Sequence, residues 1–120
     1  MTVTVHKITR HSVQVLTKRS REEALSSIVL RLNDEDGVNR GIFVFERFGE
    51  RRAPRPVGNR DEDAATVFLD LAHYAAVIDI VRNEKSLYLK LGWAETGRAT
   101  ALAQVSLDTK KEVLGQFFTA

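Results

Sequence analysis

The chain has 120 residues, of which 43% are hydrophobic and 28% are charged, with a formal net charge of +2. This length and composition predict one α+β domain over residues 1–120, and the small net charge excludes a strongly basic nucleic-acid binder of the histone type. The absence of cysteine excludes disulfides and cysteine-based zinc sites. With no apolar run long enough for a membrane span or a secretory signal, we expect a cytoplasmic protein.

The first segments show the alternation of apolar and polar residues that is typical of β-strands. Residues 2–8 and 12–17 both follow this pattern. Residues 9–11 form either a tight connection between two strands or a bulge in one long strand, and alternation does not separate the two. Residues 20–23 have the spacing of a helix capping box, but no amphipathic run follows, so we expect a turn there.

A hairpin with a long connection and then a basic loop are expected next. Two apolar runs, residues 27–32 and 42–48, flank the turn formers of residues 33–41, which predicts an antiparallel pair. Residues 47–60 hold five arginines, both prolines and two glycines, and this composition predicts a loop, most clearly over residues 49–60.

The second half begins with a helix. Leu71, Tyr74, Ile78 and Val81 recur at helical spacing, so residues 71–83 are predicted to be helical, with Asp70 as the N-terminal cap. Residues 87–93 and 101–107 alternate and predict a second hairpin. A short C-terminal helix is expected after Asp108 or Thr109, because Val113, Leu114 and Phe117 form one stripe. The expected fold is therefore an antiparallel sheet of about five to seven strands packed against one main helix and a short C-terminal helix.

A search for catalytic chemistry gives no candidate constellation. The three histidines, His6, His11 and His73, have no metal-ligand spacing, and the glycines form neither a dinucleotide-binding nor a triphosphate-binding loop. We therefore expect no enzymatic activity, no metal and no cofactor.

The central hairpin and the basic loop suggest a binding role. Residues 1–60 carry a charge balance of +5, whereas residues 61–120 carry −3. On a regular strand, two phenylalanines and an arginine share one face. The rings could stack on the bases of a single-stranded nucleic acid while the guanidinium group neutralises its phosphates, and the loop arginines would extend this binding groove. The alternative is that the phenylalanines pack under the helices and that the loop is an ordinary solvated connection. The candidate nucleic-acid-binding residues are Phe43, Phe45, Arg47, Arg51, Arg52, Arg55 and Arg60.

Strands at residues 2–48, a basic connection, a helix at 71–83, further strands and a terminal helix resemble the Whirly-type fold of single-strand DNA-binding transcriptional regulators. The Lys-Gly-Lys-Ala-Ala-Leu motif of plant Whirly proteins does not occur here. The resemblance implies an oligomeric, non-enzymatic protein that binds single-stranded DNA or RNA, and it assigns no individual residue.

A competing hypothesis is a homodimeric protein-interaction module. Trp93, Phe117 and Phe118 are the residues from which an apolar interface is expected, because adjacent phenylalanines on a helix point about 100° apart and a small domain does not easily bury both. A small-molecule pocket between helix and sheet is a third possibility, and no sequence motif supports it.

Overall fold

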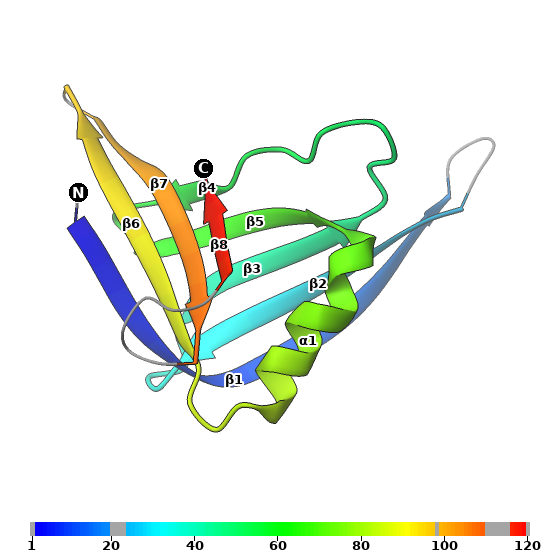
Figure 1. The fold of residues 1–120 in the computed structure, drawn as a ribbon, viewed down its shortest axis with the longest axis horizontal. Coiled ribbons are helices and arrows are strands. Elements are labelled where there is room, and N and C mark those ends of the chain that lie inside the picture. The colour runs from blue at the N-terminus through cyan, green and yellow to red at the C-terminus, as the bar shows by residue number, and fades with distance from the viewer. Residues whose placement is uncertain (1, 20–23, 98, 110–115, 120) are drawn as a thin grey trace.

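The structure is a computed structural model, and the residues described are 2–19, 24–97, 99–109 and 116–119. Eight strands, one turn of 3-10 helix at Leu71–His73 and one α-helix follow each other along the chain (Figure 1). Their bounds are β1 Thr2–Arg19, β2 Ala24–Asp34, β3 Asn39–Glu46, β4 Val57–Asn59, β5 Ala64–Asp70, α1 Tyr74–Asn83, β6 Tyr88–Thr96, β7 Ala99–Asp108 and β8 Gln116–Thr119.

The strands form one mixed and strongly curved sheet. Its order is β4-β5-β3-β2-β1-β6-β7-β8, and every neighbouring pair is antiparallel except β3 and β5, which run parallel. The curvature brings the first strand of this order close to the other end, because Gly58 of β4 lies against Trp93 of β6 and Leu102 of β7. The sheet is therefore close to a closed barrel.

The hydrophobic core lies on the concave side of the sheet. Alternate residues of the strands point inward, so that Leu30, Phe43, Leu89 and Trp93 are almost completely buried. Helix α1 packs into the same core and buries three residues of its apolar stripe, Val77, Ile78 and Val81.

The expected fold class is wrong. The protein is mostly β, and its sheet has eight strands with one parallel pair, where five to seven antiparallel strands were expected. The one α-helix among the described residues has ten residues and packs into the core on the concave side of the sheet, so it does not form a separate layer. The expected C-terminal helix is also wrong at its end, because residues 116–119 pair with β7 as strand β8, while residues 110–115 lie outside the described part of the chain.

Several local predictions are confirmed. Residues 2–19 form one long strand, and its register shifts between Ile8 and Arg10, so the bulge is the correct alternative. The two predicted hairpins are present as β2–β3 and β6–β7. The carboxylate of Asp70 caps the helical segment by accepting a hydrogen bond from the backbone N–H of Ala72 at 3.0 Å. The predicted turn at residues 20–23 lies outside the described residues.

Among the described residues, the one α-helix is too short to cross a bilayer.

Candidate functional site

The two phenylalanines of the predicted nucleic-acid site belong to the core. Phe43 and Phe45 both have no exposed surface, and the ring of Phe45 meets the ring of Tyr74 edge to face with centroids 5.3 Å apart. The inward face of β3 is covered by α1, so neither ring offers a surface on which a base could stack. This corrects the binding role expected for these two residues.

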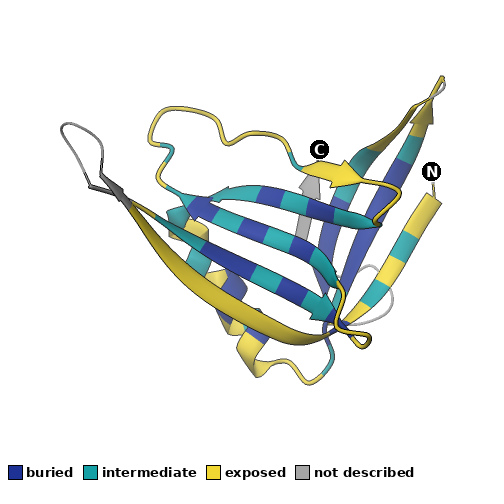
Figure 2. Cartoon of the chain, turned by 180° about the vertical axis from the view of Figure 1, so that it is seen from behind, coloured by how far each residue is buried: buried dark blue, intermediate teal, exposed yellow. Residues whose placement is uncertain are grey.

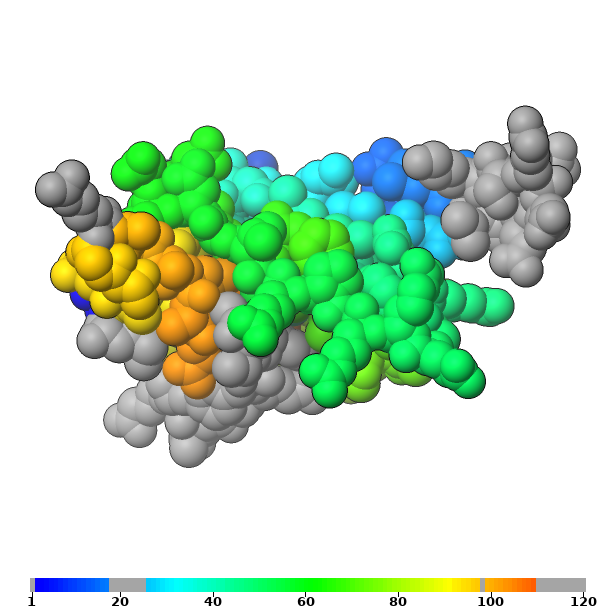
Figure 3. Space-filling view, turned by 90° about the horizontal axis from the view of Figure 1, so that it is seen from above, coloured from blue at the N-terminus to red at the C-terminus, as the bar shows by residue number. Residues whose placement is uncertain are grey.

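The predicted arginines separate into two groups. Arg47, Arg51, Arg52 and Arg55 are exposed on the connection between β3 and β4, and none of them makes an ion pair with another described residue. Figure 3 shows this connection, in green, projecting from the body of the molecule. Arg60 is placed differently, because its guanidinium lies 5.6 Å from the centre of the Trp93 ring and within 3.9 Å of Asp63. Arg60 thus supports the closure of the sheet.

A polar cluster around Asp63 joins β1 to the turn between β4 and β5. The hydroxyl of Thr4 donates to Oδ1 of Asp63 at 2.6 Å, and the indole N–H of Trp93 donates to the same hydroxyl at 3.2 Å. Nε2 of His6 lies 2.8 Å from Oδ2 of Asp63, which is an ion-pair distance. A hydroxyl nucleophile would need the imidazole between hydroxyl and carboxylate, whereas here the carboxylate is in the middle. The geometry is that of a clamp, which holds Asp63 at a φ of 50°.

A second clamp lies at the turn between β2 and β3. Oδ2 of Asp34 accepts a hydrogen bond from Nε of Arg40 at 2.8 Å, and Oδ1 accepts from the backbone N–H groups of Asp36 and Val38. The bond from Arg40, followed by those from the two backbone N–H groups, keeps the pKa of Asp34 below its ordinary value, against the opposing effect of burial. Arg40 also donates to the carbonyl oxygen of Glu62, so this pair ties two turns together.

A buried charged pair on the outer side of β6 and β7 was not foreseen from the sequence. Nζ of Lys90 lies 3.2 Å from Oδ2 of Asp108, and the hydroxyl of Ser106 donates to the same oxygen at 2.6 Å. All three side chains are almost fully buried. The alternation along β6 indicates where Lys90 points. Lys90 lies between two core leucines and therefore faces the opposite side of the sheet. The ion pair joins β6 to β7, while Oδ1 of Asp108 is buried without a hydrogen-bond partner among the described residues.

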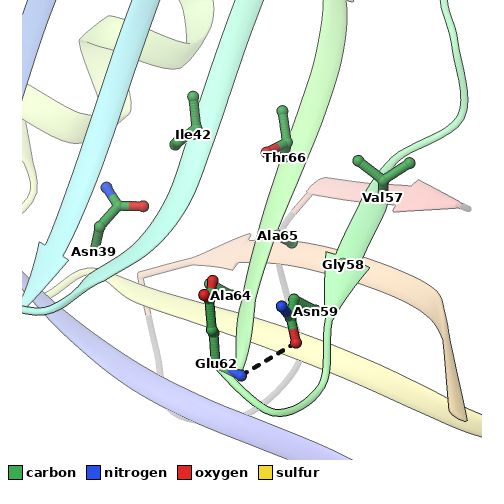
Figure 4. A pocket seen from close by; sticks show the side chains of 9 residues that line it. All are labelled: Asn39, Ile42, Val57, Gly58, Asn59, Glu62, Ala64, Ala65 and Thr66. Atoms are coloured by element: carbon green, nitrogen blue, oxygen red, sulfur yellow. Dashed lines mark hydrogen bonds between the residues drawn. The ribbon is translucent and has the colours of Figure 1, made fainter.

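One surface hollow, of about 350 Å³, lies outside β3, β4 and β5, and Glu62 is the only titratable residue among the described residues that line it (Figure 4). Another hollow is bordered by Arg10, Asp34, Glu35 and Asp36. Within the described ranges, no three histidine or carboxylate side chains gather as metal ligands would.

The most unusual surface feature is strand β1, whose two halves have different neighbours. Residues 2–7 pair with β6, and residues 8 and 10–19 pair with β2. The backbone N–H of Ile8 still bonds to the carbonyl of Leu87, but within the described chain no backbone partner occurs on that side beyond Ile8. We call the backbone of residues 9–17 on this side the free edge of β1.

The free edge is accompanied by exposed apolar side chains. Seven large hydrophobic residues are exposed among the described residues, and five of them lie on β1: Val3, Val5, Val13, Val15 and Leu16. Figure 2 shows β1 exposed along most of its length, whereas β2, β3 and β5 alternate between buried and partly buried positions. Val15 is 64% exposed, the largest value among the seven. The sequence showed the strand, but only the structure shows that one of its edges lacks a partner.

Comparisons with protein-family models, curated proteins and solved structures give no match to this chain. They therefore do not test the resemblance to Whirly-type proteins, and the candidate surfaces stand on their geometry.

Proposed function

We propose that this chain is a non-enzymatic binding module that docks another protein along the free edge of β1. The observation that carries the proposal is the change of neighbour near Ile8, which leaves residues 10–17 paired, among the described residues, on one side only. Every second residue of such an edge directs a backbone N–H and C=O away from the sheet, and an added strand satisfies them. A partner strand would extend the sheet without any change in its fold.

The outer part of the β1–β2 hairpin strengthens this proposal. Strand β3 pairs with β2 only from Ile28 onward, so residues 24–27 of β2 pair with β1 alone. In Figure 1 this two-stranded arm extends beyond the rest of the sheet. Isolated two-stranded ribbons are only marginally stable in water, and a third strand would stabilise this one.

The edge of the sheet at strand β4 fits this role less well. Strand β4 has only three residues and follows Pro54 and Pro56, and prolines and short strands are common ways to block pairing at an edge.

The interface expected at Trp93 is not available, because that side chain is 1% exposed and packs in the core. The side chains of Phe117 and Phe118, from which the same interface was expected, lie outside the described part of the structure. The lack of cysteine supports the proposal that the protein functions in a reducing compartment such as the cytoplasm.

The test is position-specific crosslinking in cells that express the protein. A photo-crosslinking residue at Val15 should give discrete, protease-sensitive adducts. The matched control places the same residue at Val57, which is 57% exposed on β4, and should give none. Adducts of equal strength at both positions, or none at either, would contradict the proposal. An adduct of twice the chain mass would identify the homodimer.

A second candidate function is the binding of single-stranded nucleic acid by the loop arginines. Arg47, Arg51, Arg52 and Arg55 are exposed, and no carboxylate among the described residues neutralises them through an ion pair. Among the described aromatic residues none is fully exposed, so phosphate contacts would have to supply most of the affinity. The oligomeric, non-enzymatic DNA-binding role that the Whirly-type resemblance implies belongs to this candidate.

A further inference from the structure

We infer that the occupant of the free edge of β1 is an extended segment of another protein in which acidic and apolar residues alternate. This inference rests on the proposed function and names the chemistry of its partner. Two observations carry it: the distribution of charge along β1, and the different character of the two faces that a partner strand would meet.

The formally charged residues of strand β1 are all cations, and one of them, Arg10, borders a hollow that Asp34, Glu35 and Asp36 also line. Its eighteen residues contain four cations, Lys7, Arg10, Lys18 and Arg19, and no aspartate or glutamate. On the neighbouring strand, Arg31 adds a further cation, and its guanidinium donates to the amide oxygen of Gln14 at 2.9 Å. An acidic segment is attracted to this edge, while charged groups of the same sign placed opposite each other on two strands repel.

The same charges disfavour a second copy of this chain as the occupant. If two β1 strands paired with each other, each would bring four cations to the interface, and neither strand would contribute a carboxylate. Lysine and arginine on exposed edges are a known means of preventing self-pairing of sheets. A nucleic acid would satisfy the charge, but it has no strand backbone to pair with the free edge and no apolar side chains to cover the valines.

The two faces of the edge specify alternation in the partner. Val13 and Val15 lie opposite Leu30 and Ile28 of β2, on the face that belongs to the core side of the sheet. Arg10 and Gln14 lie on the other face, where Arg31 of β2 also lies. Because successive side chains of a strand point to opposite faces, a partner strand meets both environments in turn. Apolar residues would cover the valines, and carboxylates would face the arginines.

The probe is a capped synthetic peptide of alternating glutamate and valine, about ten residues long, which matches a strand. We expect it to shift the NMR amide signals of residues 9–17 and to protect every second of these amides from hydrogen exchange. A lysine-valine peptide of the same length should bind at least about tenfold more weakly, because it meets charges of its own sign. Added salt should weaken the glutamate-valine complex.

Matched variants test the location. Val15→Asp should weaken binding of the glutamate-valine peptide about tenfold, because it adds a like charge and removes apolar contact. Val5→Asp changes another exposed valine, on the half of β1 that already pairs with β6, and should leave binding unchanged. Both positions are exposed, and the unperturbed NMR spectrum of the remaining residues verifies that each variant is folded.

Three results would overturn the inference. The first is equal binding of the lysine-valine peptide, and the second is protection that maps to α1 or the loop at residues 47–60. The third is protection of residues 9–17 without any peptide at a doubled sedimentation mass, which would assign the edge to a second copy. If Val15 crosslinks to a protein but the glutamate-valine peptide does not bind, only the partner chemistry is wrong. If both fail, the proposed function is wrong as well.

Discussion

Gly58 of β4 lies directly against the indole ring of Trp93 on β6. A Cβ atom at position 58 would come within 2.8 Å of Cη2 and 3.0 Å of Cζ3 of that ring, and within 3.0 Å of Cβ of Leu102. The backbone of β4 therefore reaches the opposite end of the sheet only because residue 58 has no side chain. This contact, together with Arg60 over the same indole, brings the sheet close to a closed barrel.

We expect Gly58→Ala to lower the free energy of unfolding by about 1–3 kcal/mol, since the indole is fixed in the core and must move to admit a methyl group. Urea denaturation measures the effect. The control is Val57→Ala, because Val57 is largely exposed and its truncation should change stability little. Equal midpoints for the Gly58→Ala variant and the parent protein would show that β4 does not pack on Trp93.

The clamp at Asp34 predicts a pH dependence. Its pKa in the folded state lies below the ordinary value of 3.8, chiefly because Arg40 and two backbone N–H groups donate to the carboxylate. Folding is therefore stabilised by ionised Asp34 above about pH 3.8, and the stabilisation is lost as pH falls through the folded-state pKa. Asp34→Asn should destabilise the protein by about 1–3 kcal/mol at neutral pH.

The measurement is urea denaturation of both proteins between neutral pH and pH 3. The difference between the parent and Asp34→Asn should shrink on the acidic side. The exposed neighbour Asp36→Asn is the matched control and should show a much smaller difference at every pH. A difference for Asp34→Asn that does not vary with pH would mean that the lost charge is not its cause.

The buried pair on the outer side of β6 and β7 predicts strong non-additivity. Lys90→Met or Asp108→Leu alone leaves one charge buried without its partner and should cost about 3–5 kcal/mol. The double variant removes both charges and should recover most of this loss. Thermodynamic coupling from the four denaturation curves measures the interaction. Simple additivity of the two losses would show that the charges do not interact.

Local patterns predicted much of the secondary structure, and closure of the sheet was beyond them. The alternation on β1 and the helical stripe from Leu71 to Val81 each depend on neighbours in the chain, so the sequence shows them directly. The parallel pairing of β3 with β5 and the contact of Gly58 with Trp93 join segments that are far apart in sequence. No periodicity encodes such contacts. For this reason the sequence led us to expect an antiparallel sheet packed against one main helix.

The candidate site was missed for a related reason. Alternation at Phe43 and Phe45 correctly placed both rings on one face, but a single strand does not reveal which face becomes the core. Conversely, the alternation of residues 12–17 predicted a strand but did not indicate that Val13 and Val15 are exposed. They are exposed because β6 leaves β1 after Lys7 and no other described strand takes its place. Exposure of an edge depends on the whole sheet.

The burial of Phe45 predicts a loss of stability. Phe45→Ala should lower the free energy of unfolding by about 3–5 kcal/mol, because it empties a site in the core and removes the edge-to-face contact with Tyr74. Val44→Ala, on the other face of the same strand and only partly buried, is the control and should cost less. Unchanged stability of Phe45→Ala would return this ring to the list of candidate binding residues.

The nucleic-acid candidate is tested by the loop arginines alone, without changes in the core. If they bind phosphates, the logarithm of the association constant for a labelled single-stranded oligonucleotide should fall with the logarithm of salt concentration, by about 0.7 for each phosphate neutralised. The triple variant Arg51→Ala, Arg52→Ala, Arg55→Ala should weaken binding to all sequences and reduce this slope by up to about 2. Fluorescence anisotropy at several salt concentrations measures both effects.

The matched control for the loop removes an equally exposed cation elsewhere. Arg82→Ala, at the end of α1, should leave the affinity and the salt slope unchanged. Because the loop arginines make no ion pair with described residues, their replacement should also leave the stability of the fold unchanged, so any loss of binding would report on phosphate contact. Undetectable binding of the parent protein at low salt would reject this candidate. Binding that the triple variant retains in full would place the nucleic acid on another surface, and β1, which contains four cations and no carboxylate of its own, would be the next surface to test.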